Sequence, residues 1–311
     1  MRAFVGTLTA VLSAAAYAQP APTFPNRPIR MVAGMPAGGG ADLNARRLAE
    51  KLVENIAGAA GSSAPVTVSG GNPDGHTILF TSHPVFAVNP ILYDKLPFNP
   101  DDFQPVALVS QAPHVLLANL SLPATRVPDL IALARSKPRA INYGSGGQGT
   151  SLHLSGELLN HLHKIELVHV PYRGAAPAIV ALVANEIQLL FDNSMSAIGH
   201  LRSGRVKALG IAARARLPAI ADVPTLDESG SPGFEASIAH AVMVVNAVPK
   251  PTVAVLNRAV NAAVNDAEYK AAVTEFGVTL IGGTPEHLMK FLASERAKFA
   301  DIIRKRNVKV N

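Results

Sequence analysis

Short apolar runs alternate along the chain with longer stretches whose apolar residues recur every three or four positions. The apolar run at residues 28–33 predicts a first strand, and a Gly-rich turn separates it from a predicted helix at about residues 41–56. Leu48, Leu52 and Ile56 recur every fourth residue along this helix, which gives it one apolar face. Such alternation of strands and helices is typical of an α/β protein built on a parallel sheet.

The same alternation continues through the rest of the chain. The expected strands lie at residues 77–80, 106–109, 114–118, 140–143, 167–170, 187–191 and 241–245, and the expected helices lie at residues 127–136, 150–163 and 175–183, with two or three more near the C-terminus. No repeat and no flexible linker divides the sequence. We therefore expect two lobes joined by strands that cross between them near residues 106–116 and 234–246, with the N- and C-terminal segments together in one lobe.

The N-terminus carries a processing signal. Arg2 supplies a short positive region, residues 3–16 are apolar, and Ala16-Tyr17-Ala18 is a small-x-small cleavage site. We interpret residues 1–18 as a secretory signal peptide that directs the protein to the periplasm. No later apolar run is long enough to span a bilayer, so the mature protein is expected to be soluble. The chain has no Cys, and core packing alone must hold it together.

The formal net charge of +6 makes an anionic partner worth considering. Lys and Arg are spread singly along the chain, however, and the densest cluster is Arg304-Lys305-Arg306. Nucleic-acid binders usually carry a basic stripe, with aromatic residues interleaved where they bind single strands. With no Trp and 5% aromatic residues, the sequence predicts a basic protein that does not bind nucleic acid.

Five loops follow predicted strands and could carry chemistry. They lie at residues 35–42, 81–83, 143–151, 171–174 and 192–194. In open α/β sheets, ligands bind at the carboxyl ends of the strands. The first and third loops are rich in Gly and each opens a helix, so their backbone N–H groups could cradle an anion. Asp42 lies in the first turn of its helix, where it could cap that helix or contact a ligand amine or hydroxyl.

The third loop also permits a different function. Gly144, Gly146 and Gly149 match the G-x-G-x-x-G fingerprint of dinucleotide-binding enzymes, between a strand and a helix. The acid expected after the next strand is missing, although Arg173 at that point could suit a 2′-phosphate. An exported oxidoreductase therefore stays as the alternative function.

The helix after this loop carries a possible metal site. His153, Glu157 and His161 lie four residues apart, a spacing that some metal sites use. The opposing face carries Leu154, Leu158 and Leu162 and is expected to be buried. The His/Glu face is then expected to face solvent. We therefore expect no metal, and the sequence shows no nucleophile elbow, P-loop lysine or thiol nucleophile, so we expect no catalysis and no cofactor.

Motifs in a fixed order carry a resemblance to a known family. They lie at residues 25–30 (PNRPIR), 36–42 (PAGGGAD), 73–77 (PDGHT), 89–93 (NPILY), 96–98 (LPF), 102–106 (DFQPV), 142–145 (NYGS), 153–157 (HLSGE), 168–174 (VHVPYRG) and 222–225 (DVPT). The chain resembles the Bug family of extracytoplasmic solute receptors, the binding components of tripartite tricarboxylate transporters. The likeness covers nearly all of the mature chain.

The resemblance implies a type II periplasmic binding-protein fold, in which two α/β lobes joined by two crossing strands enclose the ligand. Residues 25–107 with 237–311 would form the first lobe, and residues 108–236 the second. The implied protein is a monomeric receptor that captures a small carboxylate for a membrane transporter or sensor and grips it mainly through backbone N–H groups. The candidate ligand-binding residues are Ala37, Gly38, Gly39, Asp42, Ser82, Ser145, Gly146, Gly149, Thr150, Tyr172, Arg173 and Asp192.

Two departures from the family pattern stand out. Residues 66–72 run almost directly into Pro73, so a short helix that family members carry there is expected to be deleted, which would reshape the cleft. The aromatic-Gly-Leu stretch usual at the second crossing is replaced by residues 239–246 (AHAVMVVN). The deletion leaves a third hypothesis open, a scaffold that binds no ligand.

Overall fold

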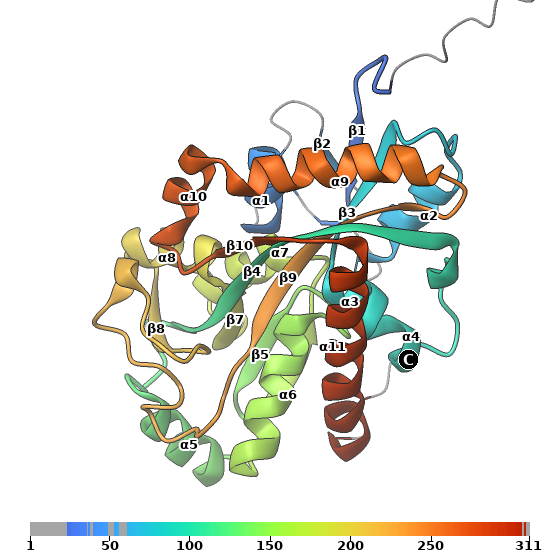
Figure 1. Ribbon diagram of the computed structural model, residues 1–311. Helices are drawn as coiled ribbons and strands as arrows, with labels where there is room; N and C mark the ends of the chain where they lie inside the picture. The colour runs from blue at the N-terminus through green and yellow to red at the C-terminus, as the bar shows by residue number, and fades with distance from the viewer. Residues whose placement is uncertain are drawn as a thin grey trace, which may run out of the picture.

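A single long strand, β4 (Phe103–Asn119), runs through the centre of the sheet (Figure 1). The structure is a computed structural model that describes residues 24–35, 37, 40–48, 53–55, 61–306 and 308. The predicted signal peptide at residues 1–18 lies outside the described residues, as do the candidate ligand residues Gly38 and Gly39.

The part of the chain before β4 alternates strands and short helices. Its elements are β1 (Arg30–Ala33), α1 (Gly40–Leu48), β2 (Val53–Asn55), α2 (Ser63–Ser69), β3 (Thr77–Ser82), α3 (His83–Ala87), α4 (Asn89–Leu92) and the 3-10 turn η2 (Pro100–Asp102). β1 pairs in parallel with both β2 and β3, as expected for strands joined by helices.

The part after β4 first builds a second parallel group and then returns. Its elements are α5 (Val127–Ser136), β5 (Asn142–Ser145), α6 (Ser151–His163), β6 (Val168–Pro171), α7 (Ala175–Val183), β7 (Leu189–Asn193), α8 (Ser194–Arg202), β8 (Val206–Ile211), the 3-10 turn η3 (Pro218–Ile220), β9 (Ser237–Val245), α9 (Lys250–Asn265), α10 (Ala267–Thr274), β10 (Thr279–Gly282) and α11 (Pro285–Arg306). β5 pairs in parallel with β6 and β7.

The strand order β2-β1-β3-β9-β4-β7-β5-β6 divides the sheet at β4, and β8 and β10 also pair with this strand. β4 pairs antiparallel with β9 and β10 over its first part and with β7 and β8 over its last. We call the part with β1–β3, β9 and β10 the first lobe and the part with β5–β8 the second lobe. β4 and β9 are thus the strands that join the lobes, and the residue boundaries given above stay a prediction.

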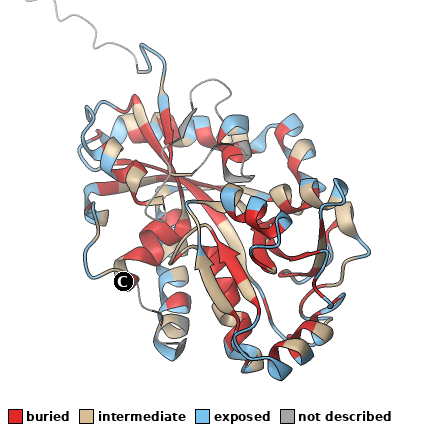
Figure 2. Cartoon of the chain, turned by 180° about the vertical axis from the view of Figure 1, so that it is seen from behind, coloured by how far each residue is buried: buried red, intermediate tan, exposed pale blue. Residues whose placement is uncertain are grey.

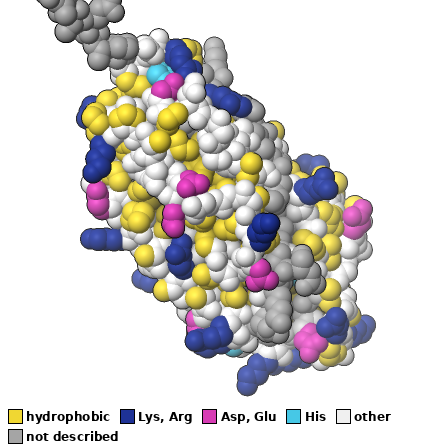
Figure 3. Space-filling view, turned by 90° about the vertical axis from the view of Figure 1, so that its right-hand side faces the viewer, with side chains coloured by type: hydrophobic (Ala, Val, Ile, Leu, Met, Phe, Trp, Pro, Cys, Tyr) yellow, Lys and Arg dark blue, Asp and Glu magenta, His cyan; other side chains and the backbone are white. Residues whose placement is uncertain are grey.

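Apolar side chains fill both faces of each lobe's sheet, and helices cover them (Figure 2). In the second lobe, successive residues of β7 point to opposite faces: Phe191 belongs to one core cluster and Leu190 to the other. On the face drawn in Figure 3, Lys and Arg side chains are scattered among acidic ones rather than gathered in a stripe.

The expected deletion in the first lobe is wrong. Residues 63–69 form the helix α2, and the strand β2 lies at Val53–Asn55, inside the segment predicted as one long helix. The run of residues 66–72 into Pro73 suggested that no helix fits here, but α2 begins earlier, at Ser63, and buries Ala64, Pro65 and Val68. Pro65 falls in the first turn of the helix, where proline is tolerated. The helix that the family pattern requires is therefore present.

The edge strand β6 is protected by a side chain. Asn160 of α6, which is buried, accepts from the Leu167 amide at 2.9 Å and donates to the Leu167 carbonyl at 3.2 Å, as a neighbouring strand would. Pro171 ends the strand without an N–H to offer. Together these features leave little free edge for pairing with another chain.

Replacing Asn160 with Ala is expected to lower the free energy of unfolding by roughly 1–2 kcal/mol, because the buried Leu167 amide loses its acceptor. Urea denaturation followed by circular dichroism measures this change. His161→Ala, at the exposed neighbouring position, is the matched control. A loss of equal size in both variants would contradict the assignment.

Candidate functional site

Hydroxyl groups within the loop between β5 and α6 hold that loop in shape. Ser145, buried at the end of β5, donates to the Gly147 carbonyl at 3.0 Å and lies 2.6 Å from Nε2 of His169. Thr150 donates to the same carbonyl at 2.8 Å and caps α6 by accepting from the His153 amide at 3.4 Å. Both hydroxyls that the sequence assigned to a ligand therefore stabilise the loop itself.

Two stacked histidines support this loop. The rings of His153 and His169 lie with their centroids 3.9 Å apart, and Nδ1 of His153 accepts from the Gly149 amide at 3.1 Å. Burial lowers the pKa of His153 to about 4 and that of His169 to about 3. Both rings are therefore neutral at pH 7 and stack without charge repulsion.

The prediction that the His/Glu face of α6 is solvated is wrong. His153 is 5% exposed, whereas Leu162, expected in the core, is 38% exposed. The reason is that α6 packs against the sheet on one side and contacts α11 on another, which periodicity alone does not show. Glu157 is half-buried and accepts from the Tyr143 hydroxyl at 2.7 Å, and only His161 is exposed. Within the described ranges, no group of three or more His, Cys, Asp or Glu residues could hold a metal ion.

Gly146 lies against the start of α7. A Cβ at this position would be 3.3 Å from the Ala175 amide nitrogen and 3.3 Å from the Gly174 carbonyl carbon. α7 begins after Gly174 and has no side-chain cap. The N–H groups of its first turn are thus not satisfied by a capping side chain, which is the condition under which a helix N-terminus attracts an anion.

Gly149 is where the two lobes touch. Its φ of +80° favours glycine, and a Cβ would lie 2.6 Å from Cδ2 of Leu92 and 3.2 Å from Oδ1 of Asn89, both in α4 of the first lobe. The neighbouring Tyr93 donates its hydroxyl to the Gln148 carbonyl at 3.0 Å. The glycine therefore allows the loop of one lobe to approach the helix of the other.

A chain of contacts leads from this point back to β1. Asn89, fully buried, donates to Oγ of Ser62 at 3.0 Å. Ser62 follows Gly61, and a Cβ on Gly34, just after β1, would lie 2.9 Å from the Gly61 carbonyl oxygen. The loops after β1 and after β5, more than a hundred residues apart in sequence, thus begin at the same junction between the lobes.

Only part of the first predicted loop is described. Ala37 is exposed, and Asp42 is buried in the first turn of α1, where its carboxylate accepts from Nε of Arg46 at 2.9 Å. Asp42 thus has a structural role: its carboxylate stabilises α1 through the ion pair with Arg46 and through its place at the helix N-terminus. α1 contacts α8, so the helix that follows this loop lies beside the second lobe.

The turn from β7 into α8 holds a buried acid. The Asp192 carboxylate accepts from the Asn193 amide at 2.8 Å through Oδ1, while Oδ2 has no hydrogen-bond partner in the described part of the chain. Burial raises the pKa of Asp192 to about 6, against the opposing effects of the Ser196 side chain and the Asn193 amide. Ser194 is likewise buried, and its Oγ has no partner among the described residues.

The remaining predicted residues differ in exposure. Ser82 is half-buried at the start of α3 and makes no side-chain capping bond. Tyr172 is half-buried beside Gly144, at 3.5 Å from the position of a Cβ there, whereas Arg173 is exposed. The structure thus places Ser82 and the loops of the second lobe at strand ends, as expected. The side chain of Arg173 lies on the surface.

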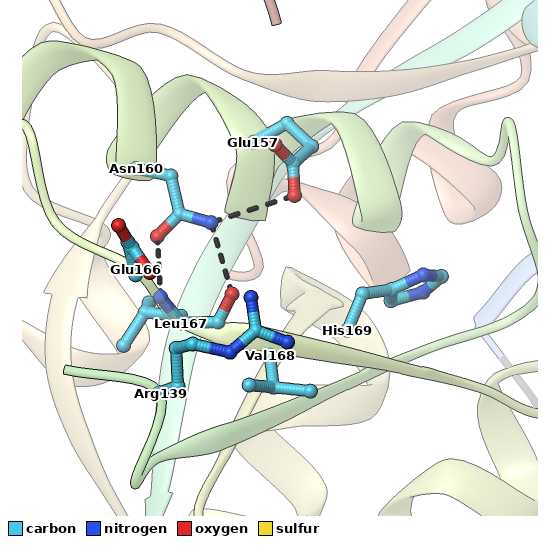
Figure 4. Close-up of a pocket in the computed structure, with 7 residues that line it drawn as sticks. All are labelled: Arg139, Glu157, Asn160, Glu166, Leu167, Val168 and His169. Atoms are coloured by element: carbon cyan, nitrogen blue, oxygen red, sulfur yellow. Dashed lines mark hydrogen bonds between the residues drawn. The ribbon is translucent and has the colours of Figure 1, made fainter. Parts of the chain in front are cut away.

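A pocket of about 390 Å³ lies elsewhere, along the edge strand β6 (Figure 4). It is lined by Arg139, Glu157, Asn160, Glu166, Leu167, Val168 and His169. Figure 4 shows the Asn160 amide bonded to Leu167 and Glu157 across one end. None of the candidate ligand-binding residues that the structure describes lines this pocket.

Comparison with known proteins identifies the family. A model described as "Tripartite tricarboxylate transporter family receptor" matches residues 41–308. The chain belongs to this family. BugT of Bordetella pertussis is 31% identical over 93% of this chain and 92% of its own length, in keeping with the expected Bug-family membership, which is confirmed.

Two solved structures of this kind resemble the receptor closely. Rpa4515 of R. palustris with adipate has a TM-score of 0.88 and 29% identity, covering 92% of this chain and 99% of that chain. MatC (Rpa3494) from Rhodopseudomonas palustris with bound malate has a TM-score of 0.83 and 32% identity, covering 90% of this chain and 100% of that chain. The predicted α/β fold of a type II periplasmic binding protein is confirmed.

The family consists of periplasmic solute-binding receptors, which are not enzymes. Of the helices that the structure describes in this receptor, none has the length and apolar character needed to cross a membrane. Sequence reasoning missed two polar residues at the lobe junction, Ser62 and Asn89. Asn89 stands in the family stretch at residues 89–93, and Ser62 stands before the helix that was expected to be deleted.

Proposed function

We propose that this chain is an exported receptor that holds a small carboxylate between its two lobes for a tripartite tricarboxylate-type transporter or a sensor. The observation that carries the proposal is the structural similarity, over nine-tenths of the chain, to proteins that contain malate and adipate. Cleavage of residues 1–18 would release it into the periplasm as a monomer. The scattered positive charge supports a small anionic ligand rather than a nucleic acid.

The geometry of the second lobe supports backbone recognition of a carboxylate. Gly146 leaves the start of α7 uncovered, and α7 has no side-chain cap. The carboxylate would accept from these N–H groups, with the helix dipole adding a favourable interaction. Because the Ser145 and Thr150 hydroxyls already fix the loop, the N–H groups are held in place before the ligand arrives, which limits the entropy lost on binding.

The same loop gives less support to a dinucleotide. A Cβ on Gly144 would lie 2.3 Å from Cδ1 of Ile187, so this glycine is needed for packing inside the lobe. Gly149 is needed for contact with α4. Packing within the protein therefore explains why two of the three fingerprint positions are glycine, without a bound pyrophosphate. The scaffold hypothesis depended on a deleted helix, and α2 is present.

Replacing Gly146 with Val is expected to reduce carboxylate affinity at least a hundredfold and to leave the fold intact, because the added side chain covers the start of α7. A thermal-shift screen of carboxylates and NADP, followed by calorimetry, measures binding to both proteins. Gly199→Val is the matched control, since no atom outside its own helix lies within 4 Å of a Cβ there. Stabilisation by NADP alone, or by no carboxylate, would overturn the proposal.

A further inference from the structure

Two buried polar atoms at the start of α8 lack partners. These are Oδ2 of Asp192, a residue 1% exposed, and Oγ of Ser194, a residue 0% exposed; neither has a hydrogen-bond partner in the part of the chain that the structure describes. A buried polar group without a partner destabilises the folded protein, and a charged one does so more strongly. Such groups are retained in proteins where a water or a ligand completes them.

The Asp192 carboxylate is directed at the first turn of α8, a helix of nine residues. Its Oδ1 accepts from the Asn193 amide, and the Ser196 side chain also interacts with the carboxylate. Asn193 in turn caps the helix by accepting from the Ser196 amide at 3.2 Å. The helix end is therefore already satisfied by its own residues, and Oδ2 is the acceptor left over.

The position of these atoms connects them with the proposed site. β7 ends at Asn193 and lies beside β5, whose carboxyl end leads into the Gly146 loop. α8 also contacts α1, the helix that follows the first predicted loop. The leftover atoms thus lie at the same edge of the sheet as the loops assigned to the carboxylate.

The chemistry of the two atoms restricts which groups can serve as their hydrogen-bond partners. A carboxylate oxygen only accepts hydrogen bonds, and it repels the negative charge of another carboxylate. Its partner must therefore be a donor. Ser194 can accept from the same group or donate to a neighbouring oxygen.

We infer that the ligand is a carboxylate that also bears a hydroxyl or ammonium group, which donates to Asp192 and contacts Ser194. The inference rests on the proposed function, since it names the class of acid bound at that site. Asp192 acts as the specificity-determining residue: it selects substituted acids over their unsubstituted analogues, which would leave its oxygen unpaired.

Calorimetry with matched acids tests this inference. The probes are propionate, lactate and alanine; succinate, malate and aspartate; and glutarate, 2-hydroxyglutarate and glutamate. In the series that binds, the hydroxy or amino acid is expected to bind roughly ten- to hundredfold more tightly than the unsubstituted acid, as for a hydrogen bond to a charged group. Asp192→Asn is expected to reduce this preference at least tenfold, and Ser194→Ala threefold or more, with little change for the unsubstituted acid.

Controls separate the possible failures. Asp222→Asn removes an exposed acid and is expected to keep the preference, and circular dichroism with thermal melting shows whether each variant folds. If Asp192→Asn does not fold, Ser194→Ala and the wild-type preference decide the matter. Equal binding of substituted and unsubstituted acids by the wild type would overturn the inference and leave the proposed function standing. If no acid of the three series binds, both the inference and the proposed function are contradicted.

Discussion

Between pH 6.5 and pH 4 the free energy of unfolding is expected to fall by several kcal/mol. Burial lowers the pKa of His83, His114 and His169 to about 3 and that of His153 and His240 to about 4, and it also lowers the pKa of His163 and His200. The unfolded chain takes up protons on these groups near pH 6.5, so below that pH it binds more protons than the native state. Stability is therefore lost as the pH falls, and the loss levels off near pH 3.

Three of these histidines lie where the lobes are joined. His114 is on β4, with its ring nitrogens 2.9 Å from Oγ of Ser155 and 3.3 Å from Oγ of Ser151. His240 on β9 stacks on Phe80. His83 begins α3 and accepts from the Ala239 amide at 3.1 Å through Nδ1. Charging any of these rings places a cation inside the crossing strands.

Nearby acids and bases modify the expected loss without reversing it. Glu295 lies 3.4 Å from Nε2 of His83, and Lys298 adds an opposing positive charge. Burial raises the pKa of Glu295 and of Asp192, so these two acids favour the native state as the pH falls. Each unit of pKa difference is worth about 1.4 kcal/mol, and the lowered histidines outweigh two raised acids in a protein whose total stability is on the order of 5–15 kcal/mol.

Acid titration followed by circular dichroism measures the midpoint of unfolding. His240→Phe keeps an aromatic ring against Phe80 and removes one protonation site, so its midpoint is expected to move to lower pH. His287→Gln changes an exposed histidine of α11 and is expected to leave the midpoint in place. A protein whose stability is the same at pH 7 and pH 4 would contradict this account.

Replacing Gly156 with Ala is expected to lower the free energy of unfolding by about 2–3 kcal/mol, even though Ala favours helices. A Cβ at this position would lie 2.2 Å from Cε2 and 2.5 Å from Cζ of Tyr143, a side chain 1% exposed. α6 or the ring must move. The ring centroid of Tyr143 lies 5.0 Å from that of His169, which contacts Ser145, so the ligand loop is expected to move as well and carboxylate affinity to fall.

Urea denaturation of single and double variants isolates this clash. In a Tyr143→Leu background the smaller side chain leaves room, so adding Gly156→Ala is expected to cost little there. Gly199→Ala, with open space around its Cβ, is expected to stabilise α8. An equal cost of Gly156→Ala in both backgrounds would show that Tyr143 is not the obstacle.

Periodicity predicted two helices of the second lobe to the residue. The helices expected at residues 127–136 and 175–183 are α5 (Val127–Ser136) and α7 (Ala175–Val183), because each buries one continuous apolar stripe. The first lobe was harder, since α2 is short and its first three residues are Ser63, Ala64 and Pro65 rather than an apolar repeat. Length alone did not decide the outcome: β4 was expected as two strands at residues 106–109 and 114–118, and α8 and β8 were not expected at all.

The candidate site could be predicted only in part. Strand ends and glycines pointed to the loop after β5, and the structure places it at the junction between the lobes. The sequence could not show that Ser145 contacts His169 or that His153 is buried, because these depend on β6 and on α11, which are brought together only by the fold. Contacts such as that of Asn89 with Gly149 arise from tertiary packing alone.

The central strand β4 has a consequence for how this receptor holds together. β4 pairs with strands of the first lobe over residues 103–113 and with strands of the second lobe over residues 114–119, so one continuous strand belongs to both lobes. Because this strand is shared, we expect the two lobes to unfold together in one transition. A motion that opens the lobes must bend this strand while leaving its ladders intact.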